Sequence, residues 1–142
     1  MTKQIINTLE DDPLACAGRM NAAMQPIYAQ FHAGAVIGAL STSFAQLIVE
    51  RGGSNEPLLK ALHLFSTAPL PLRTQLRKCH ANVKTMISSL KRDGFSHYAI
   101  LWAMMGNILA LHAACRCPQA DIDSARDNMI MQINDAQRLS VN

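Results

Sequence analysis

Residues 72–92 of the chain read LRTQLRKCHANVKTMISSLKR, and the spacing of the apolar residues in this stretch decides the fold class. These residues recur after three or four positions, at Leu72, Leu76, Cys79, Val83, Met86 and Leu90. Such spacing places them along one side of an α-helix, whereas a half-buried strand alternates apolar and polar residues. The stretch therefore predicts a long amphipathic helix with one side against a core.

Start and stop signals predict further helices. The Asp-Pro pair at 12–13 is typical of an N-cap and a first helical residue, and we expect this helix to reach about residue 25. Pro26 either kinks the chain or begins a second helix, which should run to residue 51 and stop at Gly52-Gly53. The remaining helices are expected at about 55–66, 72–92, 96–115 and from 118 onward.

The predicted fold is all-α. The chain has no sustained alternation of apolar and polar residues, no hairpin signal and no linker long enough to divide it. We expect a single helical domain over 1–142, a bundle of about six helices with two apolar helices at its centre. Residues 1–11 are expected to form a flexible arm and residues 139–142 a frayed tail.

The two apolar helices are expected where the chain carries no Lys, Arg, Asp or Glu, at 31–49 and 98–115. Helices that are apolar on most sides are either core helices or membrane spans, and the other helices are amphipathic enough to cover a core. Each segment has a line of small residues at helical spacing: Gly34, Gly38, Ser41 and Ala45, and Ala99, Ala103, Gly106, Ala110 and Ala113. Because such lines allow backbones to approach closely, we predict that the two helices pack against each other there, unless alanine is simply common in this chain.

Charge is distributed unevenly along the 142 residues. The formal charge of +3 consists of +7 in residues 57–92, which contain no Asp or Glu, and −4 in the rest of the chain. Within the helix at 72–92, cations and a histidine follow one flank, at Arg73, Arg77, His80, Lys84 and Lys91. Helices exposed to water usually mix acids among their cations, because opposite charges three or four positions apart stabilise them. A flank without acids instead raises the local electrostatic potential.

Three interpretations of this helix remain open. Its cations form a solvated face that pairs with acidic residues of the other helices, for which the last helix offers aspartates, within the chain or across a dimer. Alternatively, they bind an acidic protein surface, or they bind the phosphates of a nucleic acid. No aromatic residue is interleaved with the cations, so stacking on single-stranded bases is not supported. The candidate partner-binding residues are Arg73, Arg77, Lys78, His80, Lys84, Lys91 and Arg92.

Residues capable of metal or nucleophilic chemistry gather near one helix end. His112, Cys115 and Cys117 lie close in sequence, and Cys79 could supply a fourth metal ligand. Structural zinc sites usually show two paired ligand clusters, however, and Cys79 already belongs to an apolar helix side, so we predict no metal and no cofactor. A cysteine beside His112 lacks an orienting acid and an oxyanion hole, so we predict no enzyme.

The expected function is that of a small non-enzymatic interaction protein, an adaptor, inhibitor or regulator. Its basic helix at 72–92 would bind an acidic protein surface; the alternatives are a nucleic-acid-binding regulator and a helical membrane protein that uses segments 31–49 and 98–115. We expect a cytoplasmic location, because the first residues lack a secretory signal and four cysteines in a chain of this length favour reduced thiols. Eight methionines and only 16% charged residues favour a homodimer.

Overall fold

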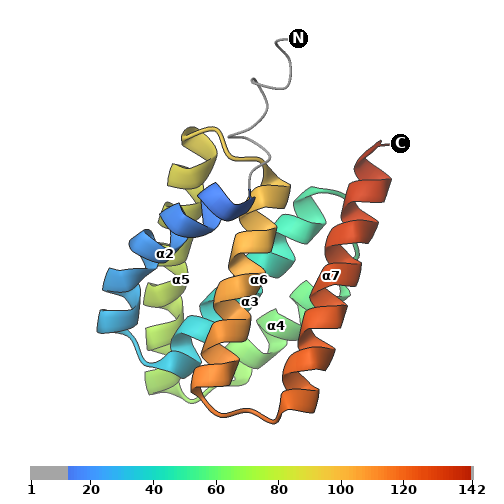
Figure 1. Cartoon of the computed structure of the whole chain (residues 1–142). Helices are drawn as coiled ribbons and strands as arrows, with labels where there is room; N and C mark the ends of the chain where they lie inside the picture. Colours follow the sequence, from blue (N-terminus) through green and yellow to red (C-terminus); the bar gives the residue numbers. More distant parts are fainter. Residues whose placement is uncertain (1–12, 142) are drawn as a thin grey trace.

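The computed structural model describes residues 13–141, which form one bundle of six helices (Figure 1). The described residues contain no strand, and the all-α prediction is confirmed. The helices are α2 (Pro13–Gln30), α3 (Ala33–Glu50), α4 (Glu56–Thr67), α5 (Leu70–Arg92), α6 (His97–Ala114) and α7 (Gln119–Val141).

Two predictions for the chain ends lie outside the described residues. These are the flexible arm at 1–11 and the N-cap at Asp12; the first described residue, Pro13, is already helical. The expected tail at 139–142 overlaps the end of α7, where the side chains after Arg138 are also outside the described part.

The boundary predicted at Pro26 is wrong. Helix α2 continues through Pro26 to Gln30, and the chain turns at Phe31 and His32 instead. His32 adopts an extended backbone conformation and caps α3, its Nδ1 accepting a hydrogen bond from the backbone N–H of Ala35 at 3.4 Å. A proline inside a helix removes one backbone hydrogen bond. Here Pro26 lies on the exposed side of α2, where water can satisfy the carbonyl left without a partner.

The other boundaries agree with the sequence signals to within one to three residues. Helix α3 ends in a turn in which Gly52, with φ of +91°, donates to the carbonyl of Val49 at 2.9 Å. Ser96 caps α6, its Oγ accepting from the backbone N–H of Ala99 at 3.1 Å. Local capping chemistry therefore fixes these ends independently of the tertiary fold.

Helix α3 lies at the centre, because it contacts each of the other five described helices. Helix α6 packs against α3, α2, α7 and α5, so the expected contact between the two apolar helices is confirmed. The core between them is fully enclosed: Leu40 of α3 and Ile100 and Leu101 of α6 have no exposed surface.

The small-residue lines do not form that contact as predicted. A Cβ added at Gly38 would lie 2.5 Å from Cδ2 of Leu76, so this glycine makes room for α5 and not for α6. A Cβ at Gly106 would meet nothing within 4 Å, since Gly106 lies in a hollow of the surface. Both glycines lie on helix sides that face away from the α3–α6 contact, where larger residues fill the core.

Candidate functional site

Helix α5 packs its apolar side against α3 and α2, as the sequence predicted. Leu76, Cys79, Val83, Met86, Ile87 and Leu90 are buried. Burial raises the pKa of the Cys79 thiol to about 11, so this cysteine is a neutral core residue at physiological pH. Because one side is anchored in the core, the cations of α5 are directed to its flanks and to solvent.

Five of the seven candidate residues have neither an ion pair nor a side-chain hydrogen bond with another residue in the described part of the chain. Arg77, Lys78, Lys84 and Arg92 are exposed, whereas Arg73 is half-buried. The Nε atom of Arg73 is buried and has no hydrogen-bond partner among the described residues. A buried polar group without a partner is unfavourable, and because this Nε is covered it is not itself a contact point for another molecule.

The other two candidates have partners within the bundle. Nζ of Lys91 lies 3.3 Å from Oε1 of Glu50, and Glu50 also contacts Nε2 of His97 at 3.3 Å. His80 packs edge-on against Phe65, and its Nε2 lies 3.3 Å from Oε1 of Gln46. Burial, and to a smaller extent the charge of Lys84, lower the pKa of His80, which favours the neutral ring at pH 7. The residues free to bind a partner are therefore concentrated toward the N-terminal half of α5.

The aspartates of α7 do not neutralise α5. Helices α5 and α7 have no contact in the described structure and lie on opposite sides of the bundle in Figure 1. Asp123 and Asp127 pair with Arg126 at 3.4 and 3.3 Å, and Asp135 pairs with Arg138 at 3.2 Å. The predicted pairing between the basic helix and α7 is therefore wrong within one chain.

A largely apolar cavity lies beside the N-terminal part of α5. It has a volume of about 520 Å³ and is bounded by α3, by α4 and by the turn that joins α4 to α5. Phe65, Leu72 and Leu76 form much of its apolar wall, and Gly34 and Gly38 contribute bare backbone from α3. We call this space the α4–α5 cavity.

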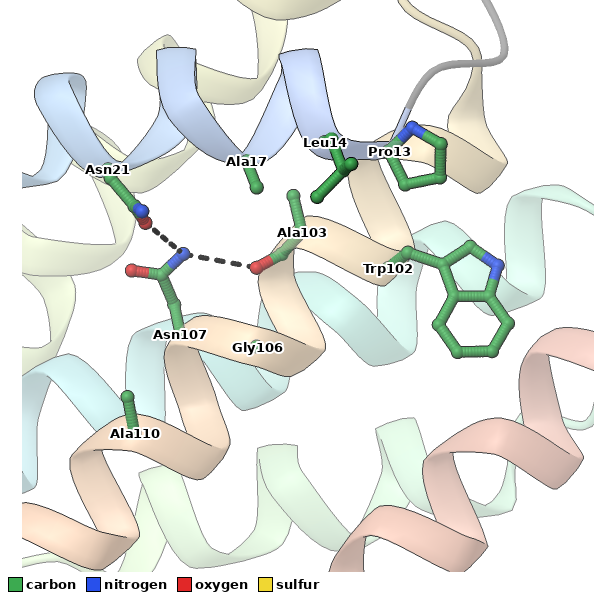
Figure 2. A pocket seen from close by; sticks show the side chains of 9 residues that line it. All are labelled: Pro13, Leu14, Ala17, Asn21, Trp102, Ala103, Gly106, Asn107 and Ala110. Carbon is green, nitrogen blue, oxygen red and sulfur yellow. Dashed lines mark hydrogen bonds between the residues drawn. The ribbon is translucent and has the colours of Figure 1, made fainter.

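A second hollow of about 470 Å³ lies between α2 and α6 (Figure 2). Its floor consists of small residues, Ala17, Ala103, Gly106 and Ala110, and Trp102 stands at one end. It contains no charged side chain and no buried polar side-chain atom that lacks a partner among the described residues, so its chemistry points to no particular ligand.

Asn107 closes the other end of this hollow with hydrogen bonds that join α2 to α6. Its Oδ1 accepts from the hydroxyl of Tyr28 at 2.6 Å. Its Nδ2 donates to Oδ1 of Asn21 at 3.1 Å and to the carbonyl of Ala103 at 3.0 Å, the two bonds drawn in Figure 2. Asn107 is 7% exposed, so the amide is buried with its donors and acceptor satisfied.

The candidate metal ligands do not come together. Cys79 is buried in the core side of α5, whereas His112, Cys115 and Cys117 lie at the end of α6. Sγ of Cys117 approaches Nδ1 of His112 at 3.5 Å, while Cys115 is exposed. Among the described residues, no three His, Cys, Asp or Glu side chains converge on a point where a metal ion could bind.

Among the described helices, one meets the length and composition needed to cross a membrane. This helix is α3, and 56% of its 18-residue apolar stretch is buried inside the bundle. The core helix of a soluble protein has the same properties, so the finding is weak evidence for a span.

Sequence reasoning missed the α4–α5 cavity and the Asn107 hydrogen bonds, since both depend on how distant helices meet. The one available signal for Asn107 was a carboxamide in the middle of a charge-free helix. Comparisons with protein-family models, curated proteins and solved structures find nothing that matches this chain. The function proposed below therefore rests on geometry, burial and charge.

Proposed function

We propose that the protein is a non-enzymatic, cytoplasmic interaction protein that binds an acidic surface of a partner protein through α5. The single observation that supports this proposal most is the lack of acidic partners for Arg73, Arg77, Lys78 and Lys84 in the described structure. These cations project from one helix whose opposite side is anchored in the core.

Two features of α5 add support. Helices commonly place acids in their first turn, where the macrodipole is positive, but α5 has none there and carries Arg73 close to that end. Its outer surface between the cations is formed by small exposed residues, Thr74, Ala81, Thr85 and Ser88. A partner carrying carboxylates can lie along such a surface without steric obstruction and supply the missing negative charge.

Binding to a defined acidic probe tests the proposal. The probe is a fluorescein-labelled peptide of Glu and Ser, and a DNA duplex of the same length serves as the nucleic-acid probe. We expect the peptide to bind in fluorescence anisotropy and its affinity to fall as salt rises, because the contact is electrostatic and solvent-exposed. In Arg73→Glu/Arg77→Glu/Lys84→Glu the affinity should fall at least about 30-fold, since each reversal replaces an attraction by a repulsion.

The matched control reverses two cations on the opposite side of the bundle. Arg126→Glu/Arg138→Glu changes α7 alone, and we expect unchanged peptide affinity. Duplex binding at about 0.15 M salt that is lost in the α5 variant would instead assign this surface to nucleic acid. Absence of peptide binding at low salt, or equal losses in the α5 and α7 variants, would refute the proposal.

A further inference from the structure

Helix α4 leaves an unusual amount of apolar surface uncovered. None of its residues is buried, and Leu59, Leu62 and Leu64 are 58%, 44% and 69% exposed. Leu70 at the start of α5 is 66% exposed, so four of the six large exposed hydrophobic residues in the described chain lie between 59 and 70. Single exposed leucines are normal, but a group of this kind beside a cavity is typical of an interaction site.

The α4–α5 cavity lies directly beneath this surface. Leu64 lines the cavity and is also exposed, and Leu59 lines a neighbouring hollow of α4 together with Leu64. The volume of about 520 Å³ is large enough to accept bulky apolar side chains from outside. Gly34 and Gly38 line the side formed by α3, where Leu76 packs closely against Gly38.

No described lysine or arginine lines the cavity itself, but two arginines follow lining residues on α5. Leu72 and Leu76 line it, and each is followed in sequence by an arginine, Arg73 and Arg77. Neither arginine has an ion pair with an acid in the described structure, and the buried Nε of Arg73 has no hydrogen-bond partner. On the outer side of α4, Lys60 adds a further cation, although Glu56 lies beside it. The surface thus combines apolar residues with a surplus of positive charge.

This combination identifies the occupant. A second copy that docked the same surface face to face would bring like charges together, because residues 56–92 contain seven cations and one acid, Glu56. An acidic amphipathic helix has the complementary pattern, with apolar side chains at helical spacing on one side and carboxylates on the flanks.

We propose that the α4–α5 cavity anchors an acidic amphipathic helix of the partner protein. Large apolar side chains of that helix enter the cavity beside Leu64, and its carboxylates pair with Arg73 and Arg77. The inference rests on the proposed function, since it states the chemistry of the partner that α5 binds.

Three synthetic peptides of about five helical turns test the anchor. The first has Leu at positions i, i+3, i+4 and i+7 with Glu on the flanks; the second replaces each Leu by Ser; the third replaces each Glu by Lys. We expect the first peptide to bind at least about 10-fold more tightly than the second, and the third not to bind. Equal binding of the first and second would overturn the anchor while leaving the proposed function intact. Failure of both to bind would overturn the two together.

Exposed leucines provide matched variants that are not expected to disturb folding. Leu64→Gln should weaken binding of the Leu–Glu peptide at least about five-fold, because the substitution removes apolar surface at the mouth of the cavity. Leu14→Gln, on α2 and 84% exposed, is the control and should leave the affinity unchanged. Methyl NMR spectra should show the largest peptide-induced shifts at Leu64, Leu72 and Leu76.

Two outcomes of these measurements would refute the anchor. In the first, the largest peptide-induced shifts occur at methyl groups far from the cavity, and Leu64→Gln binds the Leu–Glu peptide with the same affinity as the parent protein. The other is tighter binding to phosphatidylglycerol vesicles than to the Leu–Glu peptide, lost in Leu64→Gln; this result would make an anionic membrane the occupant.

Discussion

Helices α5 and α7 are both 23 residues long and lie on opposite sides of the bundle, yet they carry charge in different ways. Helix α7 has four aspartates and two arginines, and both arginines pair with aspartates of the same helix. Helix α5 has six cations and no acid, and only Lys91 has an acidic partner in the described structure. The same chain therefore builds one helix with internally paired charges and one without them.

The difference teaches which charges need an explanation beyond solvation. The i,i+3 pairs of α7 are what a solvated helix normally shows, and each contributes a few tenths of a kcal/mol. Lys91 and Arg92 have a comparable structural explanation, because cations stabilise the last turn of a helix. Arg73, Arg77, Lys78 and Lys84 have no acidic partner in the described structure, and these are the cations that the proposed function assigns to binding.

The neighbouring helices extend the contrast to apolar residues. Helix α7 anchors itself with Ile133 and Ala136, which have no exposed surface. Helix α4 buries no residue and leaves its leucines partly in water. Helix α7 is thus anchored by fully buried residues, on the closed side of the bundle, whereas α4 is not anchored in this way, and its side is open.

Truncating one apolar side chain on α7 and one on α4 should give the largest difference in the free energy of unfolding. Ile133→Ala should lower the free energy of unfolding by about 2–5 kcal/mol, because it removes fully buried methyl groups and leaves a cavity. Leu59→Ala, on the open side, should change it by less than about 0.5 kcal/mol. Urea denaturation followed by circular dichroism measures both. Equal losses would show that α4 is packed as tightly as α7, which contradicts the contrast.

The hydrogen bonds of Asn107 should have the next largest effect. Asn107→Ala should cost about 1–3 kcal/mol, since it leaves the hydroxyl of Tyr28 and the amide of Asn21 without their shared partner. Asn128→Ala is the matched control, an exposed asparagine inside α7, where the better helix propensity of alanine should dominate. If Asn107→Ala is as stable as its control, the polar contact does not help to hold α2 against α6.

The fold could be predicted from the sequence because its signals are local. The spacing of Leu72, Leu76 and Cys79, the cap at Ser96 and the stop at Gly52 each act within a few residues. The end of α2 could not be predicted in this way, because the free-energy cost of Pro26 inside a helix depends on which side of that helix faces water.

The candidate site could be predicted only in part. The sequence identified the cations of α5, but their pairing depends on residues far away in sequence, as Glu50 and Lys91 illustrate. The α4–α5 cavity depends on how loosely α4 packs over α3 and α5, and no spacing rule reports that. Local periodicity thus gives the direction of a side chain, while its partner is a property of the tertiary structure.

Acidification should lower the free energy of unfolding through His80 of α5. Burial, together with Lys84, lowers the pKa of His80 below its ordinary value of 6.5. As the pH falls below about 6.5, the unfolded chain binds the proton before the folded chain does, so stability decreases. The loss begins near the unfolded pKa and levels off once the folded ring is also protonated. His97, whose pKa is lowered mainly by burial, adds to the same trend.

Urea denaturation at about pH 7.5 and about pH 5 measures this loss. The difference between the two conditions should be smaller in His80→Gln than in the parent, since glutamine cannot titrate but can still bond to Gln46. His63→Gln, an exposed histidine on α4, is the matched control. If the free energy of unfolding of His80→Gln depends on pH as that of the parent does, the imidazole of His80 does not contribute to the loss of stability.

The smallest expected effect is that of reversing one arginine, which should change the free energy of unfolding in opposite directions on α5 and α7. Arg77→Glu should stabilise the protein by about 0.3–0.5 kcal/mol, because it replaces like charges at Arg73 and Arg77, four positions apart, by an attractive pair. Arg126→Glu should destabilise it by a similar amount, since it places a third carboxylate beside Asp123 and Asp127. Thermal unfolding at low salt, repeated at high salt where both effects should shrink, measures them. A stabilising Arg77→Glu that also loses the acidic peptide would show that α5 keeps its cations for binding and not for folding. A destabilising Arg77→Glu would mean that the arginine is already paired in the folded chain, and the contrast with α7 would fail.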